Sequence, residues 1–165
     1  MLITIRRQVF ESLDAATLVE ECFEPVHERL RGVDMGVRQQ TYEQLTSGQW
    51  ALLLYELLYE HTQRGIVEFY RRVPYLPVKT DIWAAIKSAM GYFGDEAMPP
   101  LLAEMEATYQ GYTTIGRDEH SDEAAKVRRS IEYIDSIFPK IVPATLKQIA
   151  VYIRSHPGEF VQFEA

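Results

Sequence analysis

Residues 45–72 read LTSGQWALLLYELLYEHTQRGIVEFYRR, and this stretch decides the fold. Thr46 and Gln49 have the spacing of a capping box, which predicts that a helix begins here and runs to about Thr62. Leucines and aromatic residues cover almost every side of this helix, so we expect it to be central and buried. Its polar strip, expected on the surface, is narrow and consists of Gln49, Glu56, Glu60 and Gln63.

A glycine corner follows this helix. Gly65 suits the left-handed residue that commonly ends a helix. Residues 66–72 can form two further helical turns, after which Pro74 and Pro77 are expected to impose extended backbone. The stretch therefore predicts a long helix, a corner and a short aromatic helix in succession.

Helical periodicity continues through most of the remaining chain, because apolar residues recur at steps of three and four. The predicted helices cover 12–30, kinked or divided at Pro25; 37–45; 80–93, capped by Thr80 and ended by Gly94; 98–109, with Pro99 and Pro100 in its first turn; 121–138, stopped by Pro139; and 143–153, opened by Pro143. Residues 111–120 lack periodicity and are predicted to form a loop.

The expected fold class is all-α, a single-domain bundle of about seven or eight helices spanning residues 1–165. Two short segments with period-two alternation, residues 2–6 and 160–163, could pair as a small terminal β-ribbon. A length of 165 residues with 47% hydrophobic content is sufficient for one globular core.

Composition restricts the class of partner and the compartment. The net charge of −7 repels nucleic acid phosphates, so we expect no direct nucleic acid binding and a partner of basic character. Cys22 is the only cysteine, which excludes an intrachain disulfide and favours a reducing compartment. The first residues reverse the charge order of a secretory signal, and no 18-residue apolar span exists. We therefore expect a cytoplasmic protein without a membrane partner.

The stretch EHTQRGIVEFY, residues 60–70, resembles the signature of a bacterial DNA-mimic protein family, most members of which are of unknown function. The family signature reads acid, two residues, Asn-Gly-Gly, an aromatic, any residue, Gln, then two aromatics. The matching positions are Glu60, Gly65, Phe69 and Tyr70, and the departures are Gln63, Arg64, Ile66 and Glu68. Similarity extends to the helix end at 90–94 and to residues 152–156 followed by Glu159 and Phe160.

The resemblance implies a non-enzymatic helical domain, whose characterised relative binds a transcription factor through an acidic surface that imitates the DNA backbone. Carboxylates four residues apart on a helix lie about 6 Å apart along its axis, comparable to neighbouring phosphates on one strand. The candidate partner-binding residues are Glu20, Glu24, Glu28, Glu56, Glu60, Asp118, Glu119, Asp122 and Glu123. Arginine pairs at 6–7, 71–72 and 128–129 scatter positive charge among them.

Two alternatives remain open at this point. The same acidic surface could neutralise a basic toxin, as an immunity protein or antitoxin does. A metal-dependent enzyme is the weaker alternative, because Glu24 and His27 have the Glu-x-x-His spacing of di-metal bundles, but only one copy exists and Pro25 disturbs its helix. Cys22 is expected to pack rather than react. His120, beside Asp118 and Asp122, could transfer protons, although a solvated cluster is favoured. We assign no catalytic, cofactor-binding or metal-binding residue.

Overall fold

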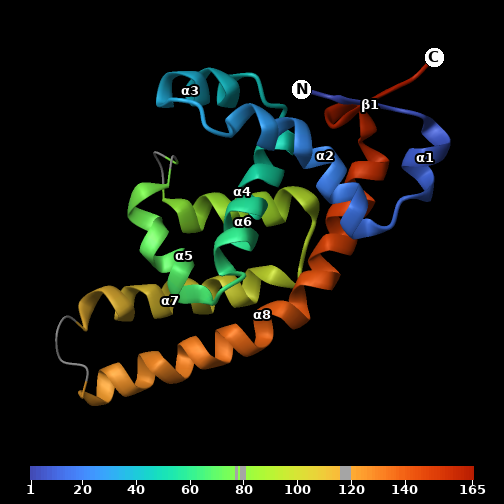
Figure 1. Ribbon diagram of the computed structural model, residues 1–165. Helices are drawn as coiled ribbons and strands as arrows, with labels where there is room; N and C mark the ends of the chain where they lie inside the picture. Colours follow the sequence, from blue (N-terminus) through green and yellow to red (C-terminus); the bar gives the residue numbers. More distant parts are fainter. Residues whose placement is uncertain (77, 79–80, 116–119) are drawn as a thin grey trace.

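The computed structural model describes residues 1–76, 78, 81–115 and 120–165, which form eight α-helices and one small sheet (Figure 1). The helices are α1 (Arg7–Ser12), α2 (Ala15–Leu30), α3 (Met35–Glu43), α4 (Ser47–Thr62), α5 (Ile66–Arg72), α6 (Ile82–Phe93), α7 (Met98–Thr114) and α8 (Asp122–Ser155), with 3-10 turns η1 (Val73–Tyr75) and η2 (Pro157–Glu159). The predicted all-α fold is confirmed. No helix in these described ranges is long and apolar enough to cross a membrane.

The two ends of the chain meet in the predicted ribbon. Strands β1 (Ile3–Ile5) and β2 (Val161–Phe163) pair in parallel, with Ile3 opposite Val161. The Ile3 N–H also donates to the Phe160 carbonyl at 3.1 Å. Figure 1 shows both termini on the same side of the molecule, so the helical bundle is the crossover between the two parallel strands.

Helix α4 is the predicted central helix, and it packs against α6, α5 and α2. The capping box is present: the Thr46 hydroxyl accepts from the Gln49 N–H, and the Gln49 side chain accepts from the Thr46 N–H. The prediction of a polar surface strip was wrong at Gln49, which is fully buried. Its amide also donates to the Met1 carbonyl, so the N-terminal segment covers it.

The two glycine corners differ. Gly94 ends α6, as predicted, and it is in the left-handed conformation, with φ 70° and ψ 25°. Gly65 has φ 104° and ψ 153°, so it is extended with positive φ, and it begins α5 instead of ending α4 in a left-handed turn. This backbone turns the Ile66 N–H toward Asp135, whose Oδ1 accepts it at 2.7 Å.

Several predicted helix breaks at proline were wrong. Helix α2 continues through Pro25, and α8 continues through Pro139 and Pro143 as one helix of 34 residues. A continuous buried stripe, Ile134, Phe138, Val142, Ile149 and Ile153, runs along both predicted halves of α8. Packing of that stripe outweighs the loss of backbone hydrogen bonds at the prolines. Figure 1 shows that α8 changes direction along its length.

Other helix boundaries differ from the predicted ones for local reasons. Asp81 caps α6 by accepting from the Trp83 N–H at 3.0 Å, whereas the predicted cap, Thr80, lies outside the described residues, as does Pro77. Pro74 lies in η1 instead of extended backbone. Helix α7 runs to Thr114 because Tyr112 packs against Tyr70, with ring centroids 5.4 Å apart, so the predicted 111–120 loop is too long at its start.

Candidate protein-binding groove

Helices α2 and α4 pack against each other and bring carboxylates from both onto one groove. Glu20 and Glu24 come from α2, and Glu56 and Glu60 come from α4. The groove has a volume of about 460 Å³. These four residues were predicted as separate helix faces, and the structure joins them. We call this feature the acidic groove.

Local sequence explains the position of the α2 carboxylates. Asp14 caps α2 by accepting from the Thr17 N–H at 3.0 Å, which fixes where the helix begins. The buried face of α2 is formed by Leu18, Val19, Cys22 and Val26. Glu20 and Glu24 are exposed and one turn apart, so they stand along the edge of this buried face.

Charge crowding in the groove is centred on Glu56. Its side chain is half-buried, and burial together with the negative charges of Glu60 and Glu20 raises the pKa of its carboxyl to about 7, burial being the largest cause. No residue in the described part of the chain donates a hydrogen bond to the Glu56 carboxylate. A cation placed in the groove would remove this penalty, because an opposite charge favours the ionised form of a carboxyl.

Apolar and aromatic side chains form the rest of the groove. Phe23 stacks on His27 with ring centroids 6.0 Å apart, and His27 Nδ1 lies 3.8 Å from Glu24 Oε2. Val19, Tyr59 and Leu146 also line it. Negative charge around an apolar floor is suited to a basic side chain with a long alkyl stem, which buries its stem and pairs its charged end.

The remaining predicted carboxylates are not part of this groove. Glu28 is exposed on α2 but does not line it. Asp122 and Glu123 occupy the first turn of α8, where negative charge stabilises the helix dipole. They precede Leu146, the α8 residue in the groove, by roughly 36 Å along the helix axis. Asp118 and Glu119 lie outside the described residues.

The residues of the family-like signature have mostly structural surroundings. Phe69 and Tyr70 are buried, and both pack edge-on against Trp83. The Tyr70 hydroxyl donates to the Met105 carbonyl at 2.8 Å. Glu68 forms an ion pair with Arg71 at 2.6 Å. Of the matching positions, Glu60 is the one that lines the acidic groove, while Gly65 shapes the corner beyond it.

The scattered arginines do not line the acidic groove in the described structure. Arg6 lies 3.9 Å from Glu164, and Arg7 lies 3.9 Å from Glu11. A neighbouring cavity shares Glu56 and Glu60 with the groove, and its cationic lining consists of Arg31, Arg38 and Arg72. Positive charge therefore borders one side of the α4 carboxylates, and the α2 side is acidic.

The groups considered for catalysis are Cys22, the Glu24 and His27 pair, and the cluster around His120. Cys22 is fully buried, and burial raises the pKa of its thiol to about 12, so it packs as predicted. Glu24 Oε2 lies 3.8 Å from His27 Nδ1, and within the described ranges no three His, Cys, Asp or Glu side chains gather as metal ligands. The cluster suggested around His120 includes Asp118, which is not described.

Sequence reasoning missed two carboxylates that the fold uses. Glu159 accepts from the Gly48 N–H at 2.6 Å and from the Tyr92 and Tyr152 hydroxyls, each at 2.8 Å. Asp135 accepts from Ile66 across 69 positions of sequence. The donors Gly48, Tyr92 and Ile66 belong to distant segments, so no local pattern indicated those contacts, and Tyr152 is the one donor close in sequence.

No protein-family model, curated protein or solved structure matches this chain.

Proposed function

We propose that this protein is a non-enzymatic interaction domain that binds a basic protein through the acidic groove. One observation carries the proposal: Glu20, Glu24, Glu56 and Glu60 converge from two helices on one groove, and no described residue donates a hydrogen bond to the half-buried Glu56. Carboxylates held together in this way repel one another, and a cationic partner relieves that repulsion.

The partner that fits best is a DNA-binding protein, for which the groove imitates the DNA backbone. Glu20 and Glu24 on α2, and Glu56 and Glu60 on α4, each have the four-residue spacing that places charges about 6 Å apart along a helix. The signature-like stretch at residues 60–70 supports the same class of partner. Its residue Glu60 contributes directly to the groove.

Affinity capture from native lysate tests this proposal. The baits are the wild-type chain, the double variant Glu20→Lys/Glu24→Lys, and Glu28→Lys as a matched control on the same helix outside the groove. We expect the wild type to retain a basic protein, and the double variant to bind it at least about tenfold more weakly, with an affinity that falls as salt rises.

The control should retain the same protein with little change, because Glu28 does not line the groove. Equal losses for both variants, or binding that ignores salt and both charge reversals, would overturn the assignment of the groove. Identification of the retained protein as a toxin instead of a DNA-binding protein would keep the groove and replace mimicry with neutralisation.

A further inference from the structure

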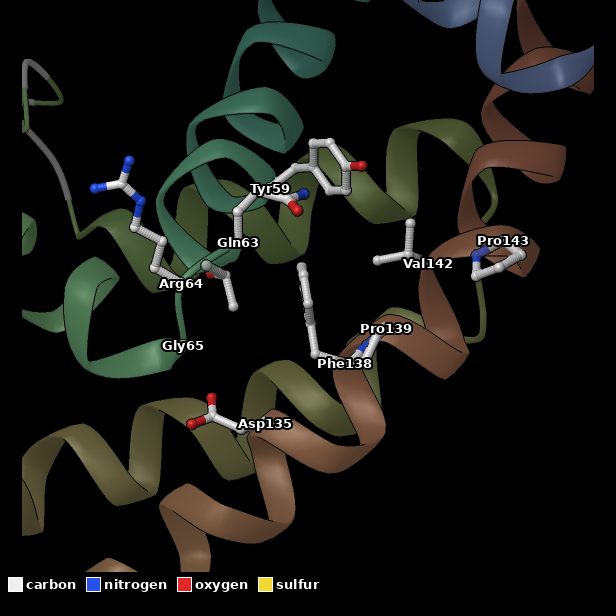
Figure 2. A pocket seen from close by; sticks show the side chains of 10 residues that line it. Tyr59, Gln63, Arg64, Gly65, Asp135, Phe138, Pro139, Val142 and Pro143 are labelled. Carbon is white, nitrogen blue, oxygen red and sulfur yellow. The ribbon is translucent and has the colours of Figure 1, made fainter.

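A second cavity lies next to the acidic groove, at the C-terminal end of α4. Its volume is about 400 Å³, within the range of roughly 300–1,000 Å³ typical of small-molecule sites. Figure 2 shows that it lies between the Gly65 corner and the part of α8 that carries Pro139 and Pro143. Tyr59 and Gln63 line both this cavity and the acidic groove, so the two are adjacent.

Asp135 provides a carboxylate to this cavity. Its Oδ1 accepts from the Ile66 N–H at 2.7 Å and so holds the start of α5 in place. The other oxygen, Oδ2, has no hydrogen-bond partner in the described part of the chain. Asp135 is exposed and forms no ion pair in the described part of the chain, and Arg64, the cation that lines the cavity, extends away from it in Figure 2. The negative charge is therefore positioned by the fold without being neutralised by it.

Backbone groups around the cavity are acceptors as well. Pro139 and Pro143 carry no N–H, so the carbonyls of Asp135 and Pro139 lose the donors that an unbroken helix would supply. Helix α4 ends at Thr62, whose carbonyl accepts from the Gly65 N–H at 2.9 Å, and this end of the helix carries the negative end of its dipole. These features all favour a positively charged or hydrogen-donating ligand.

An independent observation points the same way. Thr62 lines the cavity and is only 5% exposed, yet its Oγ1 has no hydrogen-bond partner in the described structure. A threonine hydroxyl in a helix commonly donates to the carbonyl four residues earlier, and a buried hydroxyl without a partner is destabilising. The hydroxyl is closed off from solvent in this structure, so a ligand with several N–H donors would satisfy it once the Thr62 side chain rotates toward the cavity.

We propose that this cavity binds a guanidinium group carried on an alkyl stem. The Asp135 carboxylate and the free carbonyls match the planar set of N–H donors of a guanidinium. Phe138 and Val142 line the cavity and supply an apolar wall for the stem, and Figure 2 draws the Phe138 ring edge-on. The group is supplied either by a free small molecule or by an arginine of the basic partner; only the second source rests on the proposed function.

Titration with N-acetyl-arginine-N-methylamide, followed by two-dimensional amide NMR, tests the site directly. We expect saturable shifts at Gly65, Ile66 and Phe138. The matched control is the citrulline derivative, in which a neutral urea replaces the guanidinium at nearly equal size. It should bind at least about tenfold more weakly. Equal binding of both compounds, or shifts confined to other surfaces, would refute the site.

Two variants separate charge from structure. Asp135→Asn keeps an oxygen that can accept from the Ile66 N–H and removes the charge, so it should weaken binding of the arginine derivative at least about tenfold. Thr62→Val has the same shape without the hydroxyl and should weaken binding severalfold while leaving the melting temperature equal or higher. If both variants fold and bind as the wild type does, the cavity is not the site.

Two comparisons distinguish the sources and the two proposals. Loss of partner binding in Asp135→Asn indicates that the guanidinium belongs to the partner, and unchanged partner binding indicates a free small molecule. The variant Glu20→Lys/Glu24→Lys should still bind the arginine derivative, because neither residue lines this cavity. If that variant no longer captures the partner but still binds the arginine derivative, the loss reflects the acidic groove alone and leaves the cavity proposal intact.

Discussion

One carboxylate contacts the N-terminal end of α4 and another lies in its C-terminal half. The two carboxylates have opposite surroundings. At the N-terminal end, Glu159 accepts hydrogen bonds from the Gly48 N–H and from the hydroxyls of Tyr92 and Tyr152. In the C-terminal half, Glu56 is half-buried beside Glu60 and Glu20, and no described residue donates to it. Both groups are carboxylates at tertiary contacts, but only the first is stabilised by the fold.

This difference separates structure from function along one helix. Glu159 lies where the helix dipole is positive and donors converge, so its ionised form stabilises the contact between α4 and the C-terminal segment. Glu56 is ionised at a cost, because burial and like charges both oppose it. A carboxylate that forms no ion pair in the described part of the chain is suited to binding a cation, and the acidic groove is the place where a partner would improve the electrostatics.

Removal of the Glu159 carboxylate should have the largest effect on stability. We expect Glu159→Ala to lower the free energy of unfolding by about 2–3 kcal/mol, since the buried Gly48 N–H loses a charged acceptor. Urea denaturation followed by circular dichroism measures this. Glu164→Ala is the control, because Glu164 is exposed and lies 3.9 Å from Arg6. An equal loss in both variants would contradict a structural role for Glu159.

Neutralising Glu56 should have the opposite sign. We expect Glu56→Gln to be more stable than the wild type at pH 8 by about 1–2 kcal/mol, because the amide retains the size of the side chain and removes the buried charge. At pH 4 the two proteins should differ little. The control is Glu28→Gln, an exposed residue of α2 outside the groove.

The pH dependence follows from the direction of the shift. The carboxyl of Glu56 has a pKa of about 7 in the folded protein and an ordinary value of 4.5. Between these values the folded state retains a proton that the unfolded state has lost, so stability falls as pH rises from 4.5 to about 7 and changes little above. Urea midpoints measured across this range should decline in the wild type and decline less in Glu56→Gln; equal slopes would contradict the assignment.

Features set by neighbouring residues were predictable from the sequence. The Thr46–Gln49 capping box and the end of α6 at Gly94 depend on residues a few positions apart, and both were predicted. The central position of α4 followed from its apolar residues on nearly all sides. The carboxylates of α2 and α4 were identified as candidates for the same reason, since charge spacing along a helix is a local property.

Features set by distant residues were not predictable. The meeting of the α2 and α4 carboxylates depends on how two helices pack, and the donors to Glu159 and Asp135 are separated from them by up to 111 and 69 positions. Pro139 and Pro143 locally predict a helix break, but the buried stripe of α8 continues across them. The cavity beside Asp135 exists only because that helix continues.

The smallest expected effect concerns Glu60, and it tests whether the groove carboxylates sense one another. Glu60 is exposed, so Glu60→Gln should change the free energy of unfolding by less than about 0.5 kcal/mol. It should nevertheless lower the pKa of Glu56, because the charge of Glu60 is the second largest cause of that shift after burial. Carboxyl carbon NMR of the folded protein across pH measures the pKa directly. An unchanged pKa would mean that burial alone disfavours the Glu56 charge, and the contrast with Glu159 would then lie in hydrogen bonding and not in the convergence of negative charge.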